Sequence, residues 1–148
     1  MTEDRAPSVR LIVSLYREFE QVARRGDLSM AQYRTLLYLM GGARRAGELA
    51  AAQAVTKPTV SAMLTSLRVA GWVAEEVDAA DGRVTKVALT AAGRARVRAF
   101  EAELADRMEA LIPGVNRQEL RTALAELYQA HARTREERLA DVFGPAQE

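Results

Sequence analysis

The 148-residue chain contains no cysteine and a single histidine, His131. Without cysteine it cannot form disulfides, cysteine-based zinc sites, thiol nucleophiles or thiol redox sensors. With one histidine, a His-rich metal site is excluded, and any Ser–His–Asp triad would depend on His131 alone. We therefore expect no enzymatic activity, no cofactor and no bound metal.

Long apolar runs are absent as well, because no stretch approaches the 18 residues that would indicate a membrane-spanning helix. Residues 1–8 are polar and charged and do not resemble a secretion signal. These two absences predict a cytoplasmic protein with no membrane partner. Lysine is scarce too, with 2 residues against 19 arginines, whereas alanine, which favours helix, occurs 28 times.

Apolar residues recur at helical spacing in most of the chain, and the pattern predicts six helices. Capping residues support several of their starts: Ser29 and Gln32 form a reciprocal capping box, and Thr56 and Thr90 each precede a helical segment. The predicted helices lie at about residues 9–23, 29–40, 46–53, 56–70, 90–112 and 116–139.

Between the fourth and fifth predicted helices the periodicity becomes that of strands. Residues 73–78 and 84–89 are rich in Val and Thr, and Asp81-Gly82 between them is a turn signal. A hairpin of this size is not stable alone, so it must pack against the helices before it. The predicted fold class is mainly α with a small β-hairpin wing, in which a helix-turn-helix at residues 46–70 precedes the wing.

Three stretches in this order carry a resemblance to a known family. Residues 28–36 (LSMAQYRTL) are similar to the segment L-T-x-x-Q-x-x-x-L, and residues 48–73 are similar to x-L-A … L-x-x-x-G-[WL]-V. Residues 81–93 (DGRVTKVALTAAG) are similar to D-x-R-x-x-x-V-x-L-T-x-x-G. These patterns belong to the MarR family of winged-helix transcriptional regulators, which the chain resembles over roughly residues 8–140.

The resemblance implies a homodimer that places two recognition helices in successive major grooves of a palindromic double-stranded operator. It divides the chain into a winged helix-turn-helix at residues 29–98, flanked by N- and C-terminal dimerisation helices in residues 1–28 and 99–148. Apart from the resemblance, the terminal helices are too long and too apolar to be covered by a small winged helix, which favours an interface. An intramolecular helix bundle is the alternative.

For DNA contact, the resemblance points to the helix that follows Thr56 and to the wing. Small hydroxyl side chains at the start of that helix permit close approach to base edges and phosphates. In the family, the arginine at the position of Arg83 enters the minor groove, where the negative potential favours it. The residues expected to contact DNA are Lys57, Thr59, Ser61, Ala62, Thr65, Ser66, Arg83 and Lys86.

This chain also departs from the family at the recognition helix. The family often has an arginine at the position of Ala62 and an Asp-Arg pair at the positions of Thr65 and Ser66. The departure predicts weaker or differently read DNA. It also keeps an alternative open, in which the chain is a winged-helix protein-interaction module with weak or lost DNA binding.

Many members of the family are repressors released from DNA by small, often phenolic or anionic ligands, which bind between the winged helix and the dimer helices. Tyr16, Arg17, Tyr33 and Arg107 are the residues that we expect to line such a site for an aromatic acid. Packing in the core or on the surface explains each of them equally well. The predicted function is a homodimeric, sequence-specific repressor that responds to a small effector.

The net charge of +1 hides an uneven distribution. Residues 41–98 hold nine basic and five acidic residues, a net charge of +4, whereas residues 99–148 hold six and ten, a net charge of −4. Residues 1–40 contribute the remaining +1. The basic part coincides with the predicted DNA-binding segment, so the small total is compatible with nucleic-acid binding.

Overall fold

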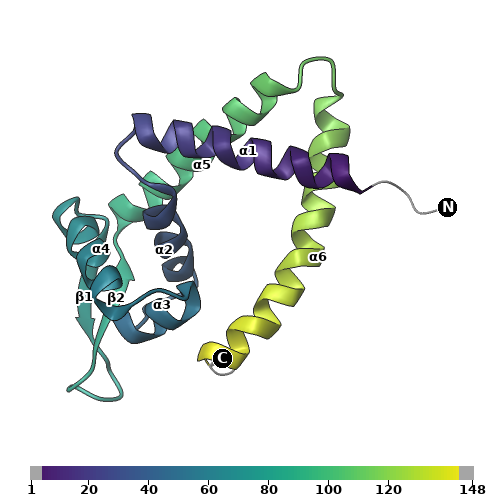
Figure 1. Ribbon diagram of the computed structural model, residues 1–148. Helices are drawn as coiled ribbons and strands as arrows, with labels where there is room; N and C mark the ends of the chain where they lie inside the picture. Colours follow the sequence, from purple (N-terminus) through teal and green to yellow (C-terminus); the bar gives the residue numbers. More distant parts are fainter. Residues whose placement is uncertain (1–4, 144–148) are drawn as a thin grey trace.

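The computed structural model describes residues 5–143, except for the side chains of residues 135–137 and 139–143. Within that range it shows six helices and one hairpin in the predicted order, so the predicted fold class is confirmed (Figure 1). Residues 1–4 and 144–148, the ends of the predicted dimerisation region, lie outside the described residues. The elements are α1 (Ala6–Arg25), α2 (Met30–Met40), α3 (Ala46–Gln53), α4 (Lys57–Val69), β1 (Val73–Val77), β2 (Thr85–Leu89), α5 (Ala91–Leu111) and α6 (Arg117–Phe143).

The predicted caps begin the helices that position the site. The N–H of Gln32 donates to Ser29 Oγ (3.1 Å), and the N–H of Ser29 donates to Gln32 Oε1 (2.9 Å), which completes the capping box of α2. The N–H of Thr59 donates to Thr56 Oγ1 at the start of α4. Between α3 and α4, Ala54 adopts the left-handed conformation (φ 52°), which ends α3 and turns the chain tightly into α4.

The wing is an antiparallel pair in which Val73 faces Leu89 and Val77 faces Thr85. A one-residue bridge from Arg44 extends the pair on its other side, because Arg44 and Val87 exchange N–H···O bonds of 2.9 and 2.8 Å. A single bridging residue has no periodicity, so the sequence did not indicate it. The bridge fixes the start of α3 against the hairpin.

Gly93, in the first turn of α5, is where the helix approaches the end of α4 and the start of the wing most closely. A Cβ atom at this position would lie 2.0 Å from the carbonyl oxygen of Trp72 and 2.8 Å from Leu89 Cδ2. Because the first of these atoms belongs to the backbone, the chain cannot make room without shifting. The T-x-x-G end of the wing pattern therefore has a steric reason.

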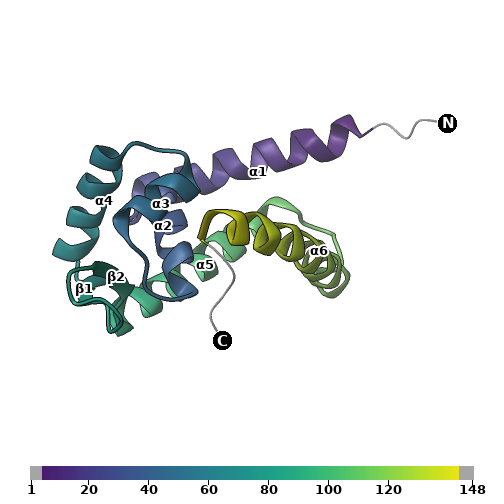
Figure 2. The ribbon, with the colours of Figure 1, turned by 90° about the horizontal axis from the view of Figure 1, so that it is seen from below.

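One buried cluster joins the last turn of α1, α2, α3, α4, the hairpin and the N-terminal two thirds of α5. Phe100 is its largest fully buried side chain, and its ring meets that of Tyr33 edge-on at 5.1 Å. Four residues of the cluster lie outside residues 29–98: Ala23, Leu28, Phe100 and Leu104. Beyond the cluster, α1 and α6 extend to the same side of the molecule (Figures 1 and 2). No helix within residues 5–143 is both long and apolar enough to cross a membrane.

Candidate nucleic-acid interface

Helix α4 has one buried and one exposed side. Val60, Leu64 and Leu67 are buried in the core, three or four positions apart. At 100° per residue, Ala62 and Thr65 lie near the middle of the opposite side. All six residues expected to contact DNA from this helix are exposed: Lys57, Thr59, Ser61, Ala62, Thr65 and Ser66.

Three hydroxyl groups on this exposed side have partners within the protein. Thr59 Oγ1 lies 2.8 Å from Thr56 Oγ1, and Thr65 Oγ1 donates to the carbonyl oxygen of Ser61 (2.9 Å). Ser66 Oγ donates to the carbonyl oxygen of Met63 (2.8 Å) and accepts from Gln32 Nε2 (2.9 Å). The helix therefore presents fewer available hydroxyl groups than its sequence suggests.

The turn of the wing carries Arg83, whose side chain is exposed. Two aspartates shape this turn: Asp78 Oδ1 accepts from the N–H of Ala80 (3.1 Å), and Asp81 Oδ1 accepts from the N–H of Arg83 (3.0 Å). Asp81 thus closes the turn through the backbone of Arg83. The hairpin loop projects away from the helices, beyond the α3–α4 unit (Figure 1).

Lys86, at the base of the wing, is in a different situation, because its Nζ atom lies 2.9 Å from Asp78 Oδ2. Arg45 Nη2 approaches the same oxygen at 3.8 Å. The hydrogen bond from Lys86, with the N–H of Ala80 and the two positive charges, holds the pKa of Asp78 below its ordinary value. Asp78 therefore neutralises much of the charge that Lys86 would offer to a phosphate.

Two further contacts position α4, and neither was predicted. Arg68 Nη2 lies 2.5 Å from Glu75 Oε1, which joins the end of α4 to β1. Gln32, already part of the capping box, joins the start of α2 to Ser66 through its other amide atom. The sequence marked Gln32 as a capping residue, but no local pattern pointed to a partner 34 positions away.

The structure gives the four residues expected at an effector site different surroundings. Tyr16 borders a groove of about 340 Å³ between α1 and α2. The ring of Tyr33 packs on Phe100, and its hydroxyl donates to Glu101 Oε1 (3.0 Å). Arg107 forms an ion pair with Glu18, and Arg17 is exposed on α1.

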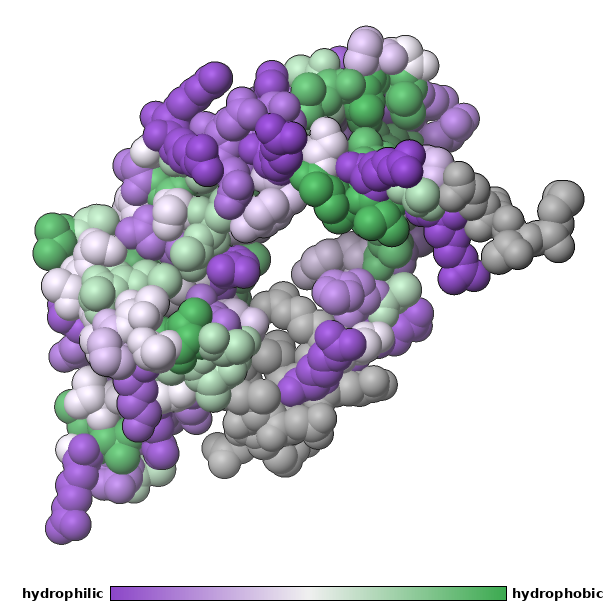
Figure 3. Space-filling model, in the orientation of Figure 1, coloured by the Kyte–Doolittle hydropathy of each residue, from purple (hydrophilic) through white to green (hydrophobic). Residues whose placement is uncertain are grey.

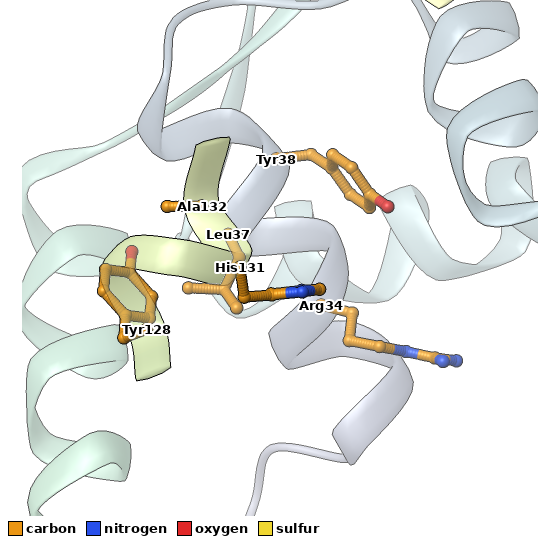
Figure 4. Close-up of a pocket in the computed structure, with 6 residues that line it drawn as sticks. All are labelled: Arg34, Leu37, Tyr38, Tyr128, His131 and Ala132. Atoms are coloured by element: carbon orange, nitrogen blue, oxygen red, sulfur yellow. The ribbon is translucent and has the colours of Figure 1, made fainter. Parts of the chain in front are cut away.

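A second cavity, of about 220 Å³, lies between α2 and α6 (Figure 4). Arg34, Leu37 and Tyr38 line it from α2, and Tyr128, His131 and Ala132 line it from α6. Arg34 also borders the first groove. These residues come from helices almost a hundred positions apart and share no motif, so no pattern in the sequence indicates them.

Comparisons with known proteins agree with this architecture. The sequence model of the MarR family matches residues 26–84, which run from the end of α1 into the wing. A comparison with curated protein sequences finds no match.

Several solved structures share the fold. A mutant of Staphylococcus aureus MepR bound to an oligodeoxyribonucleotide is 25% identical, with 87% of this chain and 96% of that chain covered and a TM-score of 0.63. Escherichia coli MarR without ligand is 23% identical, with 82% and 94% covered and a TM-score of 0.62. A MarR family protein from Bacillus stearothermophilus is 15% identical, with 90% and 98% covered and a TM-score of 0.68. These likenesses show that the chain has the winged-helix fold of MarR-family structures, and that its residues 26–84 match the sequence model of that family.

Proposed function

We propose that this chain is a homodimeric repressor that binds a palindromic double-stranded operator and is released by a small aromatic or anionic ligand. The observation that carries the proposal is the exposed side of α4 beside a projecting wing with Arg83 in its turn. In this arrangement α4 would lie in the major groove while the wing reaches the adjacent minor groove. The oligodeoxyribonucleotide bound to the MepR mutant supports DNA as the partner.

The exposed apolar side chains support the homodimer. Among the described residues, nine of the twelve large hydrophobic residues classed as exposed lie in the terminal segments: Val9, Leu11, Ile12, Val13, Tyr16, Leu111, Val115, Leu127 and Tyr128. Figure 3 shows apolar surface where α1, the end of α5 and the start of α6 come together. A contiguous surface of this kind marks an interface, and a second copy of the chain would cover it with the same surface.

Release by a ligand is supported by the two cavities that share Arg34. A guanidinium group among tyrosine and histidine side chains suits an aromatic acid. The groove next to Tyr16 is also lined by Ser29, whose N–H is bonded to Gln32, and Gln32 is bonded in turn to Ser66 of α4. A ligand that displaced this end of α2 would therefore move the recognition helix.

The proposal is tested by footprinting the purified chain at low salt on the DNA upstream of its own gene. We expect a protected palindrome with half-sites about 34–36 Å apart and an affinity that falls steeply with salt. Arg83→Ala should weaken binding and reduce the salt slope by about 1. Arg133→Ala, on α6, is the matched control and should leave both unchanged.

Absence of any protected palindrome would instead favour the protein-interaction module. The engaged hydroxyl groups of α4 are the observation on which that alternative depends.

The ligand is tested separately, by thermal shift against a panel of aromatic acids. Stabilisation by an acid should be reduced in Arg34→Ala, because both cavities lose their shared cation. An acid that stabilises both proteins equally, or that stabilises the chain without weakening its DNA binding, would contradict this part of the proposal.

A further inference from the structure

We infer that the recognition helix α4 reads its operator mainly through methyl groups, and that each half-site presents thymine C5-methyl groups in the major groove. This inference rests on the proposed function, because it concerns how the same helix distinguishes one DNA sequence from another. The ligand of α4 would be a thymine-rich major groove, and Ala62 and Thr65 would be the side chains that determine specificity.

The central part of helix α4 lacks the side chains that pair most specifically with purine bases. Its sequence from Lys57 to Val69 contains no Asn or Gln, the side chains that pair with adenine through two hydrogen bonds. Its one arginine, Arg68, is in the last turn and is held by Glu75 at 2.5 Å. Lys57 lies in the first turn, away from the middle of the exposed side. The central part of α4 therefore carries no side chain that can form a bidentate pair with guanine or adenine.

Three hydroxyl groups on the exposed side of α4 are bonded within the protein. Those of Thr59, Thr65 and Ser66 are engaged with Thr56, with the carbonyl oxygen of Ser61 and with Gln32, respectively. A threonine whose hydroxyl is bonded within its own helix still presents its γ-methyl group, which water does not bind. Ala62, between the threonines, presents only a methyl group and is exposed.

This surface of methyl groups is complementary to thymine in the major groove. Thymine is the base that displays a methyl group in the major groove, and small apolar side chains are its usual contacts. Ala62 and Thr65 are three positions apart and therefore neighbours on one side of the helix. A surface of adjacent methyl groups gains most free energy against thymine and offers guanine and adenine no hydrogen bonds in return.

The inference is tested with DNA selected from a random duplex library by the full-length chain. In the selected duplex, each thymidine of the protected half-sites is replaced in turn by deoxyuridine, which removes the methyl group and preserves base pairing and the minor groove. At a contacted position we expect about a fourfold loss of affinity, which corresponds to about 0.8 kcal/mol for burying one methyl-sized group.

Two substitutions then assign the contact. Thr65→Ser removes the methyl group and retains the hydroxyl, so it should weaken binding to the thymine duplex and abolish sensitivity to deoxyuridine at one position. Thr65→Val retains a methyl group and removes the hydroxyl, so it should remain sensitive there. Thr122→Ser is the control, because Thr122 is an exposed threonine of α6 that makes the same bond to the carbonyl oxygen four residues earlier (3.0 Å).

The possible outcomes separate the inference from the proposed function. Selected duplexes that bind equally well with thymine and deoxyuridine, or whose protected major-groove positions are guanines, would overturn the inference and leave the repressor proposal standing. If no duplex is enriched and no salt-dependent binding occurs, both are overturned. Loss of deoxyuridine sensitivity in Thr65→Val as well as in Thr65→Ser would also contradict the methyl contact.

Discussion

The centre and the ends of this chain differ in how their apolar side chains are covered. In the winged helix, Leu36, Leu49 and Leu67 are fully buried, and the hairpin and the N-terminal two thirds of α5 close the same cluster. In α1 and α6, by contrast, Ile12 is 63% exposed and Leu127 is 62% exposed. Both regions carry helical apolar stripes; the centre buries its stripes, whereas of the described side chains of α1 and α6 only Ala23 is buried within a single chain.

This difference separates two sources of stability. The centre gains its hydrophobic free energy within one chain, whereas the terminal helices retain apolar surface whose burial requires another molecule. The charges differ as well, since residues 41–98 carry a net charge of +4 and residues 99–148 a net charge of −4. Substitutions in the centre should therefore change folding, and those at the ends should change assembly.

The largest expected effect is on folding. Leu36→Ala should lower the free energy of unfolding by about 2–5 kcal/mol, because it leaves a cavity in a site that no solvent reaches. Urea denaturation measures this directly. Leu127→Ala removes the same atoms from an exposed position of α6, and at protein concentrations that favour the monomer its effect should lie within about 0.5 kcal/mol. Equal losses in the two variants would show that the ends are as well packed as the centre.

The next effect is on assembly. Ile12→Glu introduces a charge into the exposed apolar segment of α1, so sedimentation velocity should show a monomer in place of a dimer, while urea denaturation of the winged helix changes little. Met40→Glu is the control, since Met40 is an exposed apolar residue of the centre, at the end of α2. A variant of Ile12 that sediments like the wild type would argue for the intramolecular bundle instead.

The features that the sequence predicts best are those whose signal is local. The capping box of Ser29 and Gln32, the cap at Thr90 and the turn at Asp81-Gly82 each depend on residues within four positions, and all three are present in the structure. The second strand begins at Thr85 rather than at the predicted residue 84, within the usual uncertainty of an element's end. The family patterns in turn reflect steric requirements, as Gly93 shows.

The candidate site was less predictable, because its properties depend on distant partners. The sequence identified Lys86 and Ser66 as candidate contacts, but not that Asp78 pairs with one and Gln32 with the other. Nor could periodicity bring Arg34 and His131 to one cavity. The assignment of residues to DNA and to a ligand stays a prediction.

The smallest expected effect concerns two carboxylates, one in each region. Asp78 in the wing and Glu109 in α5 both have a lowered pKa, because Lys86 and Arg121, respectively, donate hydrogen bonds to them. A carboxyl whose pKa is lower in the folded protein stabilises the fold above its ordinary pKa and loses this contribution as the pH falls through the lowered value. Asp78→Asn and Glu109→Gln should therefore both weaken the dependence of unfolding on pH in the acid range.

The two substitutions, Asp78→Asn and Glu109→Gln, should differ in their effect on the affinity for DNA, because only the first removes a negative charge from the wing. Asp78→Asn retains an oxygen for the N–H of Ala80, removes a negative charge from the wing and releases Lys86. Affinity for DNA should therefore rise, and the salt slope should increase by as much as about 1, the value of one additional phosphate contact. Glu109→Gln, far along α5 from the wing, should leave the slope unchanged. If both variants bind DNA like the wild type, Lys86 makes no phosphate contact even when it is released from Asp78. Arg83 then remains the wing residue that is expected to contact a phosphate or the minor groove.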